Sequence, residues 1–395
     1  MGEVKVLHCI HSLSWGGLEI YTVELIQKLA EKGLAQKVLC SAHSRVTEEL
    51  KKSGVEVLPF PEKKLSKLKT ARLIKKIIQE HGITHLHSHT RLDMWACALA
   101  KWRKPEIQHI YNLYMNATPK RDFVHKWLFA KVDALCSSSE NILDDVKKNF
   151  PIAPEKLHLV RYGRKTESFQ HDPHKRQALR EHYGARPEHI VFGTLCRIDP
   201  GKGVRELVQA LEYLNDHELE KIQLWIVGDP TIIGKNPDGT PLFEGPSEEL
   251  SRWIAERMEN PRYREHIVRI PFQKDYVSYI DALDVFALAS YNETYSLSVL
   301  DAMMMGKPVI GTNAGGTPEQ VGLHNERGVL AEPQNAESLS HAFRHYLKHP
   351  TDIQTQGRKA QEWSLSQHSW PTTQEAFLRL YDSLGPSGSK INSAN

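Results

Sequence analysis

The chain has 395 residues, of which 40% are hydrophobic and 25% charged, a composition typical of a soluble globular protein with two domains of ordinary size. A membrane-spanning helix is excluded, because no apolar run approaches the roughly 20 residues that cross a bilayer. We also expect a cytoplasmic protein, since the N-terminus MGEVKVLHCI has no basic region or cleavage site and the five cysteines form no CxxC.

The net charge of +3 conceals an uneven distribution. Residues 1–165 hold 28 Lys and Arg against 17 Asp and Glu, a balance of +11, whereas residues 166–395 hold 23 against 31, a balance of −8. The two halves are therefore expected to meet different partners.

In chain order, the first half alternates short β-branched runs with amphipathic helices, which predicts a parallel sheet with helices on both faces. The predicted strands are Val4–His11, Lys37–Cys40, Val55–Leu58 and Ile83–His87. The predicted helices are Leu18–Lys32, Thr47–Ser53 and Leu68–His81.

The same alternation returns after a join near residues 163–175, so we predict an α/β chain of two doubly wound, Rossmann-like halves. The predicted strands are Ile190–Leu195, Gln223–Val227, Ile267–Ile270, Asp284–Ala289 and Pro308–Thr312. The predicted helices are Lys175–Tyr183, Val204–Asn215, Glu248–Met258, Val277–Leu283, Leu297–Met305 and Trp370–Leu384. Residues 229–247 are rich in Gly and Pro and predict a long surface loop, and residues 385–395 predict a disordered tail.

Two glycines, Gly16 and Gly17, lie between the first strand and the first helix. Glycine allows backbone to approach a phosphate closely, and the start of a helix supplies N–H donors. The alternative is an ordinary turn in which Glu19 favours the helix dipole.

Arg197 and Lys202 follow a strand in the second half and precede a helix. Two cations at such a junction can neutralise a diphosphate leaving group, although a solvated basic loop has the same composition.

The most informative stretch is Ser290–Glu319, with acids at Glu293 and Asp301. Asn292–Ser296 is typical of a loop that feeds the helix Leu297–Met305, whose free N–H groups favour an anion. An anion site flanked by two acids suggests a ligand with both phosphates and hydroxyls, such as a nucleotide sugar. In open α/β sheets such ligands lie beyond the carboxyl ends of the strands, so the cleft between the halves is the expected site.

Three histidines, His85, His87 and His89, alternate at the end of a predicted strand and share a face. The sequence offers no fourth ligand at a suitable spacing, so acceptor contacts or surface histidines are preferred to a metal.

The run Lys63–Lys76 contains seven Lys or Arg and no acid. It fits an anionic membrane surface, an anionic acceptor, or a solvated helix face. Nucleic acid is not expected, because the motifs of its binding modules are absent.

With these residues in view, the chain resembles the family 4 retaining glycosyltransferases, which have the GT-B fold of two Rossmann-like domains facing across a cleft. The resemblance rests on the glycine loop, the Arg197 and Lys202 pair, the strand LWIVGD that ends at Gly228, and the segment from Glu293 through GKPVIGTNAGG. It implies an acceptor domain over residues 1–165, with helix 370–384 packed back on it, and a donor domain over residues 166–369.

The resemblance also implies roles for particular residues. The glycine loop and the Arg–Lys pair would hold the donor diphosphate, Glu293 would contact the transferred sugar, and Asp301 would bind the ribose. Backbone N–H groups around Tyr295, Ser296 and Leu297 would reach the phosphate. No metal is expected, since cations and helix ends replace it.

Three departures from the family pattern stand out. Asp301 replaces the usual Glu and is one methylene shorter, and Tyr162-Gly163 replaces an Asn-Gly turn. The family's histidine near the transferred sugar would align with Tyr111, while His109 lies two residues earlier and, on a strand, on the same face, so either could serve and His109 is taken as the catalytic candidate. His87, His89 and Tyr111 are expected as acceptor contacts.

The sequence therefore predicts a cytoplasmic retaining glycosyltransferase. A peripheral position at the inner face of the membrane, through Lys63–Lys76, is a further expectation. It would move a hexose from a nucleoside diphosphate sugar, with UDP favoured over GDP, to a glycan or glycolipid in cell-envelope biosynthesis, such as lipopolysaccharide. The alternatives are a non-catalytic nucleotide-sugar-binding protein and a nucleotide-sugar epimerase on the same fold.

Overall fold

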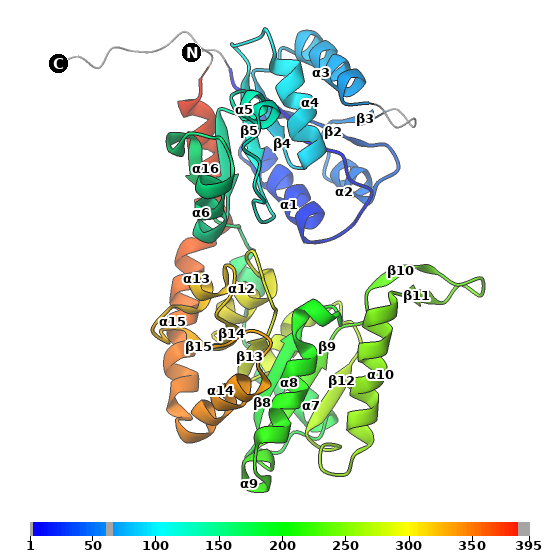
Figure 1. The fold of residues 1–395 in the computed structure, drawn as a ribbon, viewed down its shortest axis with the longest axis vertical. Helices are drawn as coiled ribbons and strands as arrows, with labels where there is room; N and C mark the ends of the chain where they lie inside the picture. The colour runs from blue at the N-terminus through cyan, green and yellow to red at the C-terminus, as the bar shows by residue number, and fades with distance from the viewer. Residues whose placement is uncertain (1–2, 61–65, 386–395) are drawn as a thin grey trace, which may run out of the picture. The chain divides into compact units, whose positions relative to one another are not determined.

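The computed structural model describes residues 3–60 and 66–385, which form two compact units (Figure 1). Unit 1 comprises the described residues up to Arg164 together with those from His368 onward, and unit 2 comprises Lys165–Gln367. The sequence placed this division at 165/166 and at 369/370. Apart from Gly385, the predicted tail lies outside the described residues.

Unit 1 is a seven-stranded parallel sheet with strand order β3-β2-β1-β4-β5-β6-β7. Its strands are β1 Lys5–Ile10, β2 Ala35–Ser41, β3 Val57–Phe60, β4 His85–Ser88, β5 Gln108–Asn112, β6 Ala134–Ser137 and β7 Leu157–Leu159. Its helices are α1 Gly17–Glu31, α2 Arg45–Lys52, α3 Lys67–His81, α4 Arg91–Lys101, α5 Phe123–Phe129, α6 Glu140–Asn149, the 3₁₀ turn η1 Pro154–Lys156, and α16 Trp370–Ser383.

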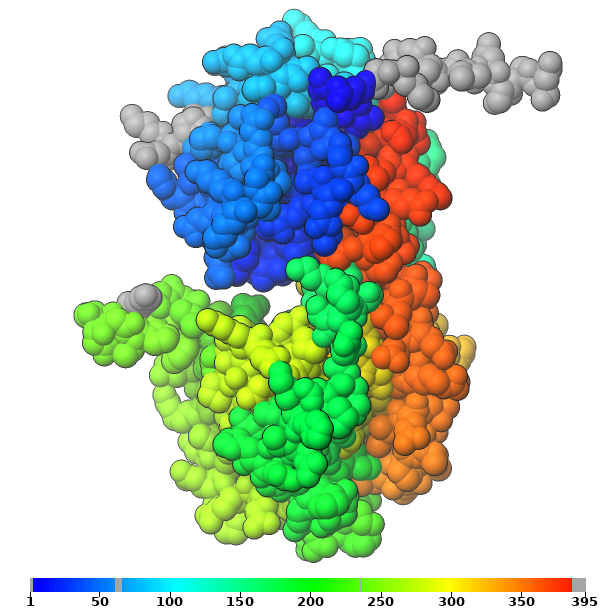
Figure 2. Space-filling view, turned by 180° about the vertical axis from the view of Figure 1, so that it is seen from behind, coloured from blue at the N-terminus to red at the C-terminus, as the bar shows by residue number. Residues whose placement is uncertain are grey.

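The C-terminal helix α16 belongs to unit 1 although more than two hundred residues separate it from β7. Gln374 donates a hydrogen bond to the carbonyl of Lys28 in α1, and the Tyr381 hydroxyl lies 2.7 Å from Nδ1 of His87. Figure 2 shows this helix, in red, directly against the blue N-terminal segments. Its buried face, including Phe377 and Tyr381, completes the core of the unit.

Unit 2 is a six-stranded parallel sheet with strand order β12-β9-β8-β13-β14-β15. Its strands are β8 Ile190–Leu195, β9 Ile222–Val227, β12 Ile267–Ile270, β13 Val285–Leu288, β14 Val309–Thr312 and β15 Gly328–Ala331. Its helices are α7 Pro173–His182, α8 Val204–Ala210, α9 Asp216–Leu219, α10 Gly245–Glu259, α11 Tyr276–Ala282, α12 Leu297–Met304, α13 Thr317–Val321, α14 Ala336–Lys348 and α15 Thr351–Gln367, with 3₁₀ turns η2 Thr166–Ser168, η3 Pro200–Lys202 and η4 Leu211–Tyr213. The predicted pair of Rossmann-like α/β domains is thus confirmed.

The prediction of a loop over residues 229–247 is wrong. Strands β10 Ile232–Lys235 and β11 Pro241–Phe243 pair antiparallel across a turn at Gly239, and α10 begins at Gly245. Gly and Pro in this stretch therefore mark the turn of a hairpin and a helix start, because both residues suit those positions as well as they suit a loop.

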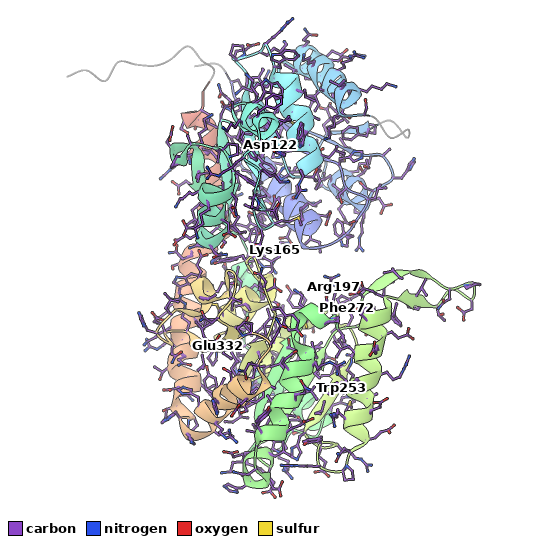
Figure 3. The ribbon with its side chains drawn as sticks, in the orientation of Figure 1. Asp122, Lys165, Arg197, Trp253, Phe272 and Glu332 are labelled. Atoms are coloured by element: carbon purple, nitrogen blue, oxygen red, sulfur yellow. The ribbon has the colours of Figure 1, made fainter. Side chains whose placement is uncertain are left out.

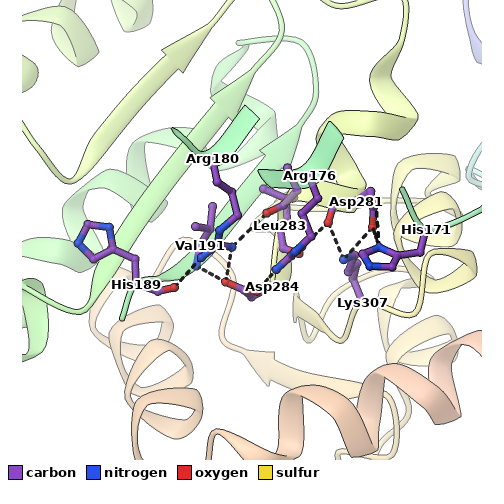
Figure 4. A network of polar contacts seen from close by, with 10 residues as sticks. His171, Arg176, Arg180, His189, Val191, Asp281, Leu283, Asp284 and Lys307 are labelled. Atoms are coloured by element: carbon purple, nitrogen blue, oxygen red, sulfur yellow. Dashed lines mark hydrogen bonds and ion pairs between the residues drawn. The ribbon is translucent and has the colours of Figure 1, made fainter. Parts of the chain in front are cut away.

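A network of ion pairs fixes the edge of unit 2 at which the strands begin (Figure 4). Asp284, just before β13, accepts hydrogen bonds from Arg176 and Arg180 of α7 and from the backbone N–H of Val191 in β8. Asp281 in turn pairs with Lys307 and with His171. The network ties the first helix of unit 2 to its central strands.

The five thiols are free, and four of them are buried. Within the described residues, no helix is both long and apolar enough to cross a membrane.

Candidate active site

The predicted phosphate cation and the predicted sugar contact meet in unit 2. Lys202 in η3 forms an ion pair with Glu293, which lies 91 residues later in the loop after β13. The same carboxylate oxygen accepts a hydrogen bond of 3.0 Å from the Ser290 hydroxyl. Both side chains are partly exposed, at 25% and 15%, so the pair lies at the surface of the sheet edge where the strands end.

Close backbone approaches at two glycines build this arrangement. Gly203 has a φ of +66°, and an added Cβ would lie 2.0 Å from the carbonyl oxygen of Ala289. Gly315 has a φ of +57°, and its Cβ would lie 2.1 Å from the carbonyl oxygen of Glu293. A side chain at either position would displace the backbone that carries the pair, so both glycines are required by geometry.

Arg197, the second predicted cation, is more exposed than Lys202. Its side chain is 65% exposed, and a guanidinium nitrogen lies 3.6 Å from a carboxylate oxygen of Asp199. Phe272, which follows β12 and is labelled with Arg197 in Figure 3, is also 65% exposed. Sequence reasoning did not single out Phe272, since a lone phenylalanine after a strand carries no motif.

The start of α12 differs from its predicted role in one respect. The backbone N–H of Ser296 donates a hydrogen bond of 2.9 Å to Oε1 of Gln320, whose amide nitrogen donates back to the Ser296 carbonyl at 2.8 Å. The Ser296 hydroxyl caps the helix by accepting from the N–H of Val299. The structure therefore corrects the predicted phosphate contact of the Ser296 N–H, because this donor already binds Gln320. The next residue, Leu297, is the first residue of the helix.

The remaining donor-site predictions lie on the same edge. Gly228 follows β9 with a φ of +137°, and an added Cβ would lie 2.0 Å from the Cys196 carbonyl, so it brings the loops after β8 and β9 together. Tyr295 and Asp301 are each 4% exposed. The short side chain of Asp301 in α12 thus presents little surface to a ribose.

In unit 1, the glycine loop precedes α1 as predicted. The N–H of Gly16 donates to Oε2 of Glu19 at 2.9 Å, and the other carboxylate oxygen of Glu19 accepts from Ser12. An added Cβ at Gly17 would meet no described atom within 4 Å. The hydrogen bond to Glu19 supports the alternative at Gly16, an ordinary turn before a helix. At position 17, packing within the described chain does not require glycine.

The structure removes His109 from the candidate site. It is fully buried in β5, with Nε2 at 2.9 Å from the Ser88 hydroxyl and Nδ1 at 3.3 Å from the Lys131 carbonyl. Burial lowers its pKa to about 3, so the ring is neutral. Tyr111, two residues nearer the end of the strand, lines a cavity instead. His109 and Tyr111 share a face of the strand but differ in their depth within the sheet. Sequence periodicity gives no information on this depth.

The histidines in and directly after β4 are not surface residues, which corrects the second of the two readings offered for them. His85, His87 and His89 are buried, and the structure joins the last two to His8 of β1. These three rings each bring one nitrogen within 4.8 Å of the others. Nδ1 of His8 also lies 3.0 Å from Nε2 of His89. The absence of a metal site stays a prediction.

A cavity of about 100 Å³ opens in unit 1 beyond the ends of β4 and β5. Its wall includes His89 and Tyr111, two of the predicted acceptor contacts, whereas His87 lies in the core. Aromatic and apolar side chains form most of it, and the complete lining is Leu18, His89, Thr90, Arg91, Met94, Trp95, Tyr111, Asn112, Leu113, Tyr114, Met115, Asn116, Lys120, His125, Phe129 and Phe150.

Comparison with known proteins identifies two family models that follow one another along the chain. The model described as "Glycosyltransferase Family 4" matches residues 15–168, and that described as "Glycosyl transferases group 1" matches residues 175–363. The chain is also similar to the D-inositol 3-phosphate glycosyltransferase of Corynebacterium glutamicum, with 22% identity over 93% of this chain and 91% of that protein.

Solved structures share the fold over nearly the whole chain. A glycosyltransferase from Rickettsia africae matches with a TM-score of 0.83 and 18% identity, covering 98% of this chain and all of that one. HepE from Anabaena in complex with UDP matches with a TM-score of 0.81 and 18% identity over 96% and 100%. The lipopolysaccharide outer core galactosyltransferase WaaB matches with a TM-score of 0.73 and 12% identity over 96% and 99%.

Proposed function

We propose, from the premise that this chain is a GT-B glycosyltransferase of the family 4 and group 1 type, that it transfers a hexose from a nucleoside diphosphate sugar with retention of anomeric configuration. The acceptor would be a hydroxyl of a glycan or glycolipid in cell-envelope biosynthesis. The similarity in fold to WaaB supports the envelope role.

The observation that carries the proposal is the Lys202–Glu293 pair at the carboxyl edge of unit 2. A diphosphate arriving here offers Lys202 a more highly charged partner, which would free the carboxylate for the sugar hydroxyls. Arg197, exposed on the same edge, would add a second positive charge for the leaving group. Charge that develops on the diphosphate as its bond to the sugar breaks would thus be stabilised without a metal.

The chemical step would be a displacement on one face of the sugar. The bond between the anomeric carbon and the diphosphate oxygen breaks as the acceptor oxygen bonds to the same carbon from the same side. The proton of the acceptor hydroxyl passes to the departing diphosphate oxygen. The protein's part is to hold the reactants and stabilise the leaving group, and Glu293 would orient the sugar.

We favour a UDP-sugar as the donor over a GDP-sugar, with Gly228 and Leu297 as further donor contacts in unit 2. Complexes of HepE with UDP and with UDP-glucose, on the same fold, support this choice.

The test is incubation of the purified chain with UDP-, GDP- and ADP-sugars, first in a thermal-shift screen and then with nucleotide release as the readout. A glycosyltransferase releases nucleotide slowly without acceptor and faster with one, and NMR of the product would show the donor's anomeric configuration. Binding without release, whatever acceptor is added, would identify a nucleotide-sugar-binding protein instead. Conversion of the donor to another sugar without acceptor would identify an epimerase.

We also propose that helix α3, the described part of the basic run, contacts an anionic membrane surface. In this helix Leu68 and Lys69 are exposed, whereas Ala71 and Ile74 are buried, so the helix is amphipathic. Residues 63–65 of that run lie outside the described residues. Co-sedimentation with phosphatidylglycerol vesicles but not with phosphatidylcholine vesicles is expected, and equal binding to both would contradict the electrostatic contact.

A further inference from the structure

The loop that carries Glu293 is bonded to α8 through a buried acid that the proposed mechanism does not use. Glu206 of α8 is 8% exposed, and its Oε1 accepts a hydrogen bond of 2.7 Å from the hydroxyl of Tyr291, 85 residues later. Its other carboxylate oxygen is buried and accepts no hydrogen bond from any described residue. A buried carboxylate with an unpaired oxygen is costly, so its presence next to the candidate site indicates a role there.

Tyr291 is the donor in this contact at every pH at which the protein is folded and active. Burial and the hydrogen bond to Glu206 raise the pKa of Tyr291 to about 12, so the phenol keeps its proton near neutral pH. A phenol that donates to a carboxylate forms a short, directional bond, which restricts the position of the ring more than apolar packing does.

The backbone of Tyr291 makes a second contact on the same side of the loop. Its N–H donates a hydrogen bond of 3.0 Å to the carbonyl of Gly201 in η3. Lys202 is the next residue of that turn. Tyr291 is therefore bonded through its backbone to the turn that carries Lys202 and through its side chain to the helix that follows. Because Glu293 lies two residues further along the loop, both members of the Lys202–Glu293 pair are attached to Tyr291.

The rest of the loop is bonded to β14 and to the segment after it. The hydroxyl of Thr312, the last residue of β14, donates a hydrogen bond of 2.6 Å to the carbonyl of Ser290. The N–H of Gly316 donates one of 2.7 Å to the carbonyl of Glu293. These contacts determine where the loop lies on the sheet, whereas those of Tyr291 determine where it lies relative to η3 and therefore to Lys202.

We propose that Tyr291 and Glu206 are positioning residues, which together form a clamp that holds Lys202 and Glu293 in place for the transfer step. They act through the loop and the turn and do not need to touch the substrate. A displacement of about 1 Å in a group that acts on the reacting atoms can lower a rate by up to about 10²-fold. The inference rests on the proposed function, since turnover reports the effect of positioning, but the clamp itself can be measured without it.

The first test is nucleotide release from UDP-glucose by the full-length protein and by Tyr291→Phe, which loses only the hydroxyl. We expect kcat to fall about tenfold and KM to change by less than about twofold, because positioning acts on the transition state more than on binding. Glu206→Leu should show the same split, whereas Glu206→Gln, whose amide oxygen can still accept the bond, should lose less than about threefold in kcat. The double variant Tyr291→Phe/Glu206→Leu should be no slower than the slower single variant, because both changes remove one contact.

Tyr346→Phe is the matched control. The hydroxyl of Tyr346 in α14 donates a hydrogen bond of the same length, 2.7 Å, to Oε1 of Gln356 in α15. Its loss should lower the free energy of unfolding, measured by urea denaturation, and leave kcat unchanged. A fall in kcat that is no larger in Tyr291→Phe than in this control would overturn the proposal, as would losses in the two single variants that multiply in the double variant.

Hydrogen exchange of the backbone provides a readout that does not need activity. Protection of the Tyr291 N–H should fall about tenfold or more in Tyr291→Phe and in Glu206→Leu, and it should be unchanged in Tyr346→Phe. Unchanged protection in Tyr291→Phe would overturn the clamp, whatever the activity. Failure of the proposed transferase function would appear separately, as the absence of nucleotide release by the wild type from any UDP-, GDP- or ADP-sugar, and the exchange measurement would then decide on the clamp by itself.

Discussion

The two edges of the parallel sheet in unit 2 carry similar residues and use them differently. Where the strands begin, Asp284 is bound to Arg176, Arg180 and a backbone N–H, so its charge is fully used within the chain. Where the strands end, Arg197 is largely exposed and the Lys202–Glu293 pair stays within reach of solvent. Saturated charges hold a fold together, whereas accessible charges are available to a ligand. Four predictions follow, from the largest expected effect to the smallest. The first two test this contrast, the third extends it to the two units, and the fourth tests an accessible loop of unit 1.

Lys202→Ala should reduce turnover by about 10²- to 10³-fold, because it removes a cation aimed at the developing charge of the leaving group. The free energy of unfolding should change by less than about 1 kcal/mol, since a partly exposed ion pair adds little to stability. Steady-state kinetics and urea denaturation measure the two quantities. Lys359→Ala, an exposed lysine of α15, is the control, and turnover of Lys202→Ala equal to that of the control would refute the assignment.

Asp284→Asn should have the opposite profile. Removing the carboxylate leaves Arg176 and Arg180 without their shared partner and should lower the free energy of unfolding by about 3 kcal/mol. Turnover of the folded fraction should match that of wild type. Asp275→Asn breaks a solvent-exposed pair with Lys175 and should cost less than about 1 kcal/mol. Equal losses in the two variants would show that the amino edge is no better packed than the surface.

Acid should loosen unit 1 before unit 2, because six of the buried histidines among the described residues lie in unit 1 and one, His189, lies in unit 2. Burial lowers the pKa of His8 and of His109 to about 3, whereas the unfolded chain titrates near 6.5. The unfolded state therefore binds more protons between these values, so stability is complete above about pH 6.5 and is lost as the pH falls towards 3.

Burial also lowers the pKa of the other buried histidines of unit 1, so their contribution to stability is likewise lost as the pH falls. These are His85, His87, His89 and His368. Asp93, whose pKa burial raises to about 6, opposes them, since the folded state gains a proton there as the pH falls below 6. Hydrogen exchange of the whole chain at pH 7.5 and 5.5 should show protection falling in β1, β4 and β5 and holding in β8 and β13. An equal loss in both units would contradict the contrast.

Gly17→Ala should have the smallest effect on stability. No described atom lies near the added methyl, and alanine in the first turn of α1 should be neutral or stabilising by up to about 1 kcal/mol. Donor affinity should nevertheless fall, because the methyl would keep a phosphate from the backbone. Gly245→Ala at the start of α10, also in open space, is the matched control for donor titration. Unchanged affinity in Gly17→Ala would remove the glycine loop from the site.

Sequence reasoning predicted both parallel sheets because strand and helix periodicities are local properties of the chain. It placed Lys202 and Glu293 in one site through the resemblance to the family 4 glycosyltransferases, and in the structure the two residues follow the neighbouring strands β8 and β13. The loop prediction for residues 229–247 was wrong because turn residues mark a reversal of the chain without showing whether its flanks pair.

Only the tertiary structure decided the contacts between distant residues. Gln320 occupies the Ser296 N–H from 24 residues away, His8 joins His89 from a neighbouring strand, and Tyr381 reaches His87 from the last helix. His109 and Tyr111 share a face of one strand, yet burial places the first in the core and the second beside a cavity. Pattern determines which side of an element a residue occupies, while packing against the rest of the chain determines whether that side meets protein or ligand.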